Sequence, residues 1–322
     1  MTTVNGAPPV SFSVDPWDPS YGMAYSEDMG GEPPQSTAEL VLDLERPADR
    51  WRPVTAGGNH HVPGAILFLD GVRRIDARVW VHGSDPQPSP GIAASYAAGL
   101  VCLDGAARIT GVTVERGLFT AAADARDIDS RHAVYLARKA AGPGMDQLSL
   151  ALQQQLSDTE VQLALLFRKE NPDASDLLFV DGPLRGRTHL DRTIGFIKTH
   201  HATYLPAEQA AVVGQLEPGQ RTPAFTMGTS WRRNSWYLRL PGAGTAPWSG
   251  VVRLECSADL PVPEVVRLAD LSMRVLPPLA SSPHKDPRAP QNLVPIGGLE
   301  RELRRRLGDP LLLYRSLRAA AG

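Results

Sequence analysis

The sequence predicts an α/β fold in which a mixed sheet is flanked by helices, with additional C-terminal strands and helices. Two unbroken apolar runs, AILFLDG at residues 65–71 and DLLFVDG at residues 176–182, are typical of central strands covered on both faces. Further strand-like runs lie between them, and a long helical pattern leads into the second run. Antiparallel strands followed by a helix and a parallel strand indicate a mixed sheet with helices on both sides.

The composition is that of an ordinary globular protein. Its 322 residues are 42% hydrophobic and 21% charged, with a formal net charge of −2. This balance gives no global signal for nucleic acid, and it does not exclude a local basic groove. Cys102 and Cys256 lie in apolar runs and form neither a disulfide framework nor a zinc pattern, so we expect buried thiols.

We expect a cytoplasmic protein with no membrane contact. No apolar stretch approaches the roughly 18 residues of a membrane span. The first twenty residues lack the basic and apolar regions of a signal peptide. Residues 1–36 are rich in Pro, Gly, Ser and acids, which predicts an extended or partly disordered arm. One folded domain is expected over residues 37–322.

The first half of this domain is mainly predicted as strands. After the strand at residues 65–70 we expect a short turn and an antiparallel neighbour at residues 75–82. The remaining predicted elements, in order, are strands at 91–103 and 107–119, helices at 133–140 and 145–167, and strands at 177–180 and 194–197.

From about residue 205 the pattern changes to short strands separated by Gly and Pro. The predicted elements are a helix at 206–213, strands in PAFTMG, SWYLRLPG and WSGVVRLEC, a helix at 263–275, and a basic amphipathic helix from near Gly298. The run SWRRNSWYLRL has two interpretations. It suits stacking on single-stranded nucleic acid, and it suits, slightly better, a strand with arginines on its solvent face.

Three acids form a candidate metal site. Asp70 and Asp181 end the two apolar strands, and Glu160 lies on the helix before the second one. Neighbouring strands would bring these carboxylates to one sheet edge, where they suit two-metal phosphodiester hydrolysis. Each acid also has an ordinary structural explanation, because Asp before Gly is common in turns and Glu is common on solvated helix faces.

Basic residues follow Asp181 in the sequence. Such groups can contact a polyanion backbone. The basic residues in this segment are Arg185, Arg187, Arg192 and Lys198. The adjacent histidines at positions 200 and 201 would point to opposite faces of an extended segment and make a poor chelating pair. The sequence has no nucleophile elbow, P-loop or dinucleotide fingerprint.

Together these elements resemble the NurA nuclease family. The matching features are FLDG, the helix glutamate, FVDGPL, the Ile-Lys pair at 197–198, and the late YLRLPG and VVRLE strands. The resemblance implies an RNase H-like fold and a Mn²⁺- or Mg²⁺-dependent DNA nuclease with endonuclease and 5′–3′ exonuclease activity. It also implies a homodimer that works with a HerA-like hexameric ATPase, a DNA translocase, in DNA end processing and repair.

The resemblance assigns roles to particular residues. Asp70, Glu160 and Asp181 would be metal ligands, and Lys198 would neutralise charge on the scissile phosphate. Family members usually close the site with a histidine near the last helix, which this chain lacks there, and Glu300 or Glu302 would supply an acid instead. The missing histidine leaves an alternative open: a catalytically weak or inactive NurA-like adaptor that binds a DNA-translocating ATPase.

Overall fold

The structure is a computed structural model that describes residues 38–55, 57, 61–82, 87–172, 175–199, 204–242, 244 and 248–321. The predicted N-terminal arm and the histidines at positions 200 and 201 lie outside the described residues. The chain forms two compact units. Unit 1 comprises Met1–His60 and Ile197–Leu293, and unit 2 comprises His61–Phe196 and Val294–Gly322.

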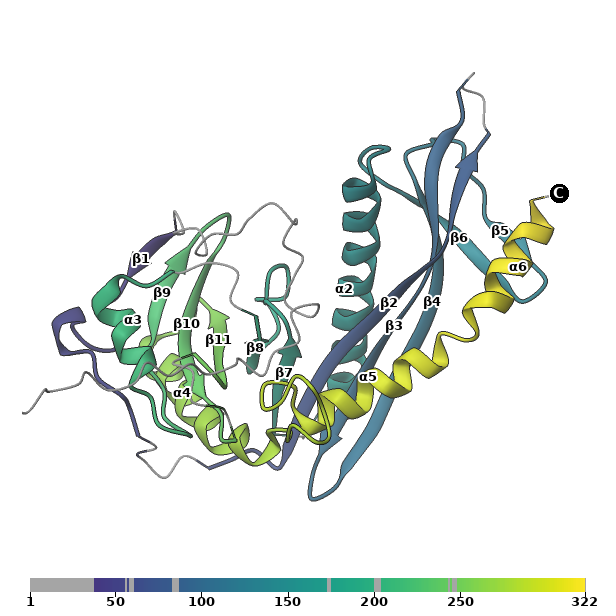
Figure 1. Ribbon diagram of the computed structural model, residues 1–322. Coiled ribbons are helices and arrows are strands. Elements are labelled where there is room, and N and C mark those ends of the chain that lie inside the picture. The colour runs from purple at the N-terminus through teal and green to yellow at the C-terminus, as the bar shows by residue number, and fades with distance from the viewer. Residues whose placement is uncertain are drawn as a thin grey trace, which may run out of the picture. The chain divides into compact units, whose positions relative to one another are not determined.

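Unit 2 is built on a mixed sheet (Figure 1). Strands β2, β3 and β4 are antiparallel to one another, and β7 and β8 run parallel to β2. This arrangement confirms the RNase H-like α/β fold. In spatial order the strands are β8 (Thr193–Ile197), β7 (Asp176–Asp181), β2 (Ala65–Val81), β3 (Ser89–Leu103), β4 (Ala107–Thr120), β6 (Ala133–Lys139) and β5 (Ile128–Ser130).

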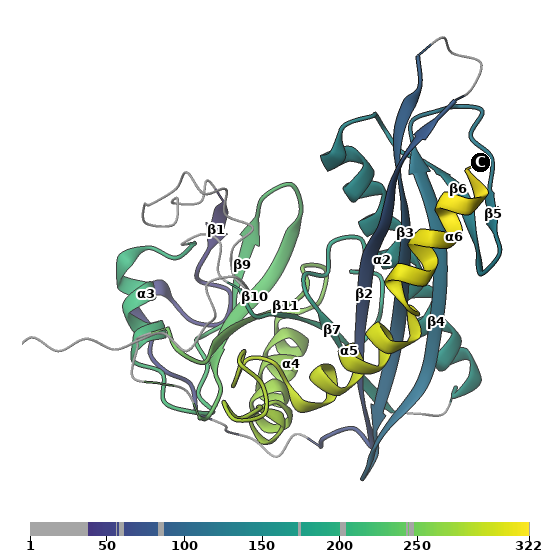
Figure 2. The same ribbon diagram turned by 45° about the vertical axis from the view of Figure 1, so that its right-hand side comes forward.

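Helices cover both faces of this sheet. Helix α2 (Met145–Glu170) lies on one face and α5 (Val294–Arg306) on the other, and α6 (Pro310–Ala320) continues beyond α5 (Figure 2). The leucine repeat of α2 is buried at Leu148, Leu152 and Leu156, since these residues share one face of the helix, whereas Leu166 is exposed. In α5, Leu299 and Leu303 are buried.

Strand β2 is longer than the sequence predicted. Its apolar start is a central strand, and Leu67, Phe68 and Leu69 are fully buried between β7 and β3. The expected turn after Asp70 is wrong, because the strand continues through Gly71 to Val81. On the β7 side, the pairing of β2 with described residues ends at Leu69, opposite Val180, one residue before β7 itself ends.

A bulge between Ile75 and Ala77 marks the second half of β2. The extra residue is Asp76, whose buried carboxylate accepts hydrogen bonds from the Ser95 hydroxyl (2.5 Å) and the Tyr135 hydroxyl (3.0 Å). Arg74 Nε donates to the same carboxylate at 2.7 Å. These bonds satisfy a charged group that would otherwise be costly to bury.

The helix predicted at residues 133–140 is wrong, because this segment forms strand β6, parallel to β4. Val134 and Leu136 are exposed while Tyr135 between them is fully buried, which is the two-residue period of a strand. Tyr135 reaches the core and the Asp76 bulge from this strand. Tertiary packing therefore overrides the helical composition of the segment.

Unit 1 contains a second group of antiparallel strands. In spatial order they are β1 (Glu39–Val41), β9 (Phe225–Gly228), β10 (Arg232–Arg239) and β11 (Val251–Ser257). The helical elements of this unit are η1 (Ala48–Arg50), α3 (Ala207–Gly214), α4 (Val262–Val275) and η2 (Pro277–Leu279). The three predicted strands and the helices over 206–213 and 263–275 are confirmed. The ends of the strands differ from the prediction by up to three residues and those of the helices by one.

Strand β10 corrects the expectation of arginines on a solvent face for Arg233 and Arg239, which are buried, whereas Arg232 is exposed. Arg233 is buried and lies 3.3 Å from Glu255, which also accepts a hydrogen bond from Arg253 at 2.9 Å. Trp236 faces the other side, where its Nε1 donates to Ser272 of α4. Both faces of β10 are therefore packed.

The two cysteines are buried and free, as the sequence predicted. Within the described part of the chain, no helix combines the length and the apolar composition that a bilayer crossing requires.

Candidate metal centre

Strand register brings the two strand aspartates together. In the parallel β2–β7 pair, Leu69 lies opposite Val180, so the next residues along each strand are Asp70 and Asp181. One step earlier on the same face, Phe68 and Phe179 stack with ring centroids 5.4 Å apart. This buried ring pair fixes the register that places the carboxylates side by side.

Asp181 ends its strand at a sharp change of direction. Gly182 follows it with φ 102°, a conformation that side-chain-bearing residues rarely adopt. The Gly182 amide still donates to Phe196 on β8 at 2.9 Å. The chain therefore leaves the sheet directly after Asp181, whereas β2 carries on past Asp70. The Asp70 carboxylate is held by the Gly71 amide, which donates to Oδ1 at 2.7 Å.

Helix α5 brings a third carboxylate to the site, because a glycine on β3 lets the helix approach the sheet. Gly99 lies directly opposite Asp70 in the β2–β3 pair, so the two residues share a face of the sheet. A Cβ atom at Gly99 would lie 2.6 Å from Leu299 Cδ1 and 3.0 Å from Leu303 Cδ2. The absent side chain lets α5 approach the sheet closely, and Glu300, next to Leu299, extends toward the aspartates.

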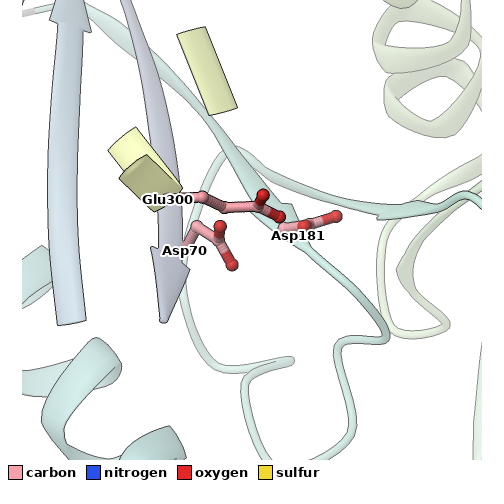
Figure 3. Close-up of side chains that lie close together, drawn as sticks. All are labelled: Asp70, Asp181 and Glu300. Atoms are coloured by element: carbon pink, nitrogen blue, oxygen red, sulfur yellow. The ribbon is translucent and has the colours of Figure 1, made fainter. Parts of the chain in front are cut away.

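Asp70, Asp181 and Glu300 form a carboxylate cluster (Figure 3). Each offers one oxygen, and these three oxygens lie within 4.8 Å of one another. Two oxygens bound to one Mg²⁺ at about 2.1 Å lie about 4.2 Å apart when they are trans and about 3.0 Å apart when they are cis, so the carboxylates would close by up to about 2 Å around an ion. Its all-oxygen donors and triple negative charge suit a hard divalent cation.

Glu160 is not part of this cluster. Its Oε1 atom lies 2.5 Å from the position that a Cβ atom at Gly71 would take. Because consecutive strand residues face opposite sides, Gly71 and Glu160 lie on the α2 face of β2, while Asp70 faces α5. The solvated helix position considered from the sequence is wrong, since Glu160 is only 4% exposed.

Arg187 pairs with Glu160. Its Nη2 donates to Glu160 Oε2 and to the Ser157 hydroxyl (2.7 Å), and its Nη1 donates to the Pro183 carbonyl (3.2 Å). Burial raises the pKa of Glu160 to about 7, and the Asp181 charge adds to this effect, while Arg187 opposes it. Asp181 is therefore a member of the cluster and also raises the pKa of Glu160.

A comparison with protein families supplies the remaining evidence. The family model for the NurA domain matches residues 91–296, about two thirds of the chain. The chain belongs to the NurA family. This family is one of nucleases. No curated protein matches the chain.

The NurA match covers two of the predicted ligands and not the others. Glu160 and Asp181 lie inside the matched range, whereas Asp70 lies 21 positions before it and Glu300 four positions after it. The geometry of unit 2 nevertheless joins Asp70 and Glu300 to Asp181. The spatial group therefore extends beyond the segment on which the family assignment depends.

Two further candidate residues from the sequence, Glu302 and Lys198, form hydrogen bonds with residues outside the carboxylate cluster. Glu302, the alternative to Glu300, is bound by Arg305 and Arg306 on the surface of α5, and these bonds lower its pKa to about 2. Lys198 belongs to unit 1, where its Nζ donates to Asn292 Oδ1 at 3.0 Å. Its role at a scissile phosphate stays a prediction.

Sequence reasoning did not find Gly99 or the partner of Glu160. A glycine inside an apolar strand is a known sign of close backbone approach, so Gly99 carried a usable signal. Arg187 had been grouped with residues that contact a polyanion, but its guanidinium is buried against Glu160. No spacing rule connects a helix glutamate to an arginine in a loop 27 positions later.

Proposed function

We propose that this member of the NurA family is a metal-dependent deoxyribonuclease that hydrolyses phosphodiester bonds. The observation that supports this most directly is the carboxylate cluster of Asp70, Asp181 and Glu300, with its oxygens within 4.8 Å. The proposed activities are endonuclease and 5′–3′ exonuclease cleavage in DNA end processing and repair. Family membership supports the nuclease class, and the cluster supports dependence on a divalent ion.

The proposed cofactor is Mn²⁺ or Mg²⁺, held by Asp70, Asp181 and Glu300. When bound, such an ion would supply Lewis-acid activation of water and charge stabilisation at the phosphate. The protein's own contribution is to fix the ligands: the Gly71 amide orients Asp70, and the close seat of α5 on Gly99 presents Glu300. Glu160 is proposed as a further ligand that becomes available on release from Arg187.

DNA is the proposed substrate, and Lys198 is proposed to neutralise charge on the scissile phosphate. We further propose a homodimer that acts in the cytoplasm with a HerA-like hexameric ATPase. These proposals rest on the family and not on any contact in the structure. Their support is that the family as a whole works with DNA and partner ATPases.

A second candidate is a NurA-like adaptor with little or no activity, which binds the ATPase. The observation in its favour is that residues 294–306 contain no histidine, where the family usually closes its site with one. The position of Glu300 favours the enzyme instead, because a third carboxylate stands beside Asp70 and Asp181.

The proposal is tested by incubating the protein with linear DNA and Mn²⁺, and then repeating the assay with Asp70→Asn and Asp181→Asn. Each variant removes a charged ligand while keeping its shape, so we expect cleavage to fall by at least about 100-fold, of the order lost with one strong electrostatic group. Glu302→Gln is the matched control, because it changes an acid on α5 outside the cluster and should leave the rate unchanged.

Cleavage that persists in both aspartate variants would overturn the proposed site. No cleavage by any form, together with retained binding of a HerA-like ATPase, would favour the adaptor.

A further inference from the structure

The surroundings of Asp181 contain four carboxylates, which lie on two faces of the sheet. Asp70, Asp181 and Glu300 cluster on the α5 face of the sheet. Glu160, on the α2 face, is neutralised by the Arg187 guanidinium. Under the proposed function a divalent ion would bind the first group, and the Arg187 guanidinium stands where a second ion would have to stand to use Glu160.

Arg187 is built into the fold. It is only 5% exposed, and its two terminal nitrogens donate to Glu160, to Ser157 on the same helix and to the Pro183 carbonyl. Its own amide donates to the Leu184 carbonyl at 2.7 Å, which closes the loop after Asp181. A guanidinium fixed by three acceptors is a permanent charge next to Glu160.

This placement controls which oxygens a metal ion can use. The terminal nitrogens of Arg187 are directed at Glu160 Oε2. Glu160 Oε1 lies against the Gly71 backbone. An ion at Glu160 would have to stand beside a guanidinium, and like charges at such a distance repel strongly in a buried site. The α5-face cluster offers three carboxylate oxygens within 4.8 Å of one another.

We propose that Arg187 takes the place of a second metal ion at Glu160, so that the DNA-free protein binds one divalent cation, on Asp70, Asp181 and Glu300. A second ion enters only when Arg187 leaves Glu160. Arg187 is thus a positioning residue that sets the metal stoichiometry of the site. This inference rests on the proposed function, because it assumes that the carboxylate cluster is a metal site.

The test is a titration of the metal-free, DNA-free full chain with Mn²⁺, followed by calorimetry and by the electron paramagnetic resonance signal of free Mn²⁺. The wild type should bind one ion per chain. Arg187→Met removes the charge but retains an unbranched apolar side chain, and it should bind two. Arg187→Lys retains the charge and should bind one.

Glu160→Gln is the complementary variant. It removes the carboxylate that a second ion would need, so it should still bind one ion with an affinity within about threefold of the wild type. The double variant Arg187→Met with Glu160→Gln removes both buried charges and should also bind one ion. Circular dichroism confirms the fold of each, and the Glu160→Gln result decides the question if Arg187→Met does not fold.

Two ions per chain in the wild type, one ion in folded Arg187→Met, or a tenfold loss of affinity in Glu160→Gln would each overturn the inference. Two ions in the wild type, or a loss of affinity in Glu160→Gln, would still leave a metal site in place, so the proposed nuclease function would survive either result. A wild type that binds no Mn²⁺ would instead remove the metal site itself and the proposed function with it.

Discussion

Glu160 is a carboxylate with almost no access to water, and its stability depends on its immediate contacts. Arg187 supplies charge and hydrogen bonds, and Ser157 shares the same guanidinium. Removing one member of a buried ion pair typically costs about 3–5 kcal/mol because the other charge is left uncompensated. Replacing both members together is much less costly for the same reason.

The raised pKa of Glu160 predicts a particular dependence of stability on pH. Its pKa is 4.5 in the unfolded chain and about 7 in the folded protein, chiefly because of burial. Between these values the folded state binds the extra proton, so the unfolding free energy of the wild type should fall, relative to Glu160→Gln, as the pH rises from about 5 to about 7. The slope cannot exceed about 1.4 kcal/mol per pH unit.

Urea unfolding of both proteins at several pH values, with EDTA present, measures this difference. Taking the difference cancels most of the titration of other groups, which the two proteins share. Above about pH 8 the difference should level off, because Glu160 is then ionised in both states. A difference that stays flat or grows between pH 5 and pH 7 would contradict the raised pKa.

At the scale of secondary-structure elements, the site depends on how α5 sits on the sheet. Gly99 lets the middle of the helix, at Leu299 and Leu303, approach the sheet closely. At the C-terminal end of the helix, Arg74 donates to the Gly308 carbonyl (2.9 Å) and Arg116 donates to the Leu307 carbonyl (3.2 Å). Positive charge beside the last carbonyls of a helix is favourable, so these arginines hold the end of α5 against the strands.

Gly99→Ala should therefore disturb the site as well as the core. The added methyl group would overlap Leu299 and Leu303, both of which are fully buried. Overpacking of this kind costs about 1–3 kcal/mol and would move α5 away from Asp70. We expect a lower unfolding free energy, measured with urea, and weaker Mn²⁺ binding, measured by calorimetry.

Gly298→Ala is the matched control for this change. A Cβ atom at Gly298 would have no neighbour within 4 Å, and the position is helical. Alanine should raise the unfolding free energy by about 0.5–1 kcal/mol through its better helix propensity and leave Mn²⁺ binding unchanged. If both variants weakened the metal site equally, the specific role of Gly99 would be disproved.

For the whole molecule, the proposed metal site predicts that the carboxylate cluster lowers the thermal stability of the metal-free protein. The three carboxylates of the cluster repel one another when no ion is bound, so Asp181→Asn should raise the thermal unfolding midpoint in EDTA. Mn²⁺ at 100 times its dissociation constant should stabilise the wild type by about 2.7 kcal/mol. It should have little effect on Asp181→Asn. Differential scanning fluorimetry measures both effects, and equal stabilisation by Mn²⁺ in the two proteins would contradict the site.

The sequence predicted the features of the whole molecule that depend on local pattern. The unbroken apolar runs before Asp70 and Asp181 located two central strands, and the leucine repeat located α2. The turn after Asp70 and the helix at residues 133–140 were wrong. In both segments the outcome depends on distant partners: β3 continues alongside β2, and β4 pairs with β6.

The candidate site was only partly accessible from the sequence for the same reason. Asp70, Asp181 and Glu300 were candidates from the sequence, and the structure shows that strand register and Gly99 place them together. Glu160 was also a candidate, but its burial against Arg187 depends on a loop that folds back onto α2. Such contacts between distant segments leave no periodic trace in a single sequence.

The central claim is that Asp70, Asp181 and Glu300 bind one divalent cation. Anomalous diffraction from crystals grown with Mn²⁺ and without DNA tests it most directly. We expect a single strong peak within bonding distance, about 2.2 Å, of an oxygen from each of the three carboxylates. A peak at Glu160 without one at the cluster, or no peak near Asp70 and Asp181, would contradict the claim.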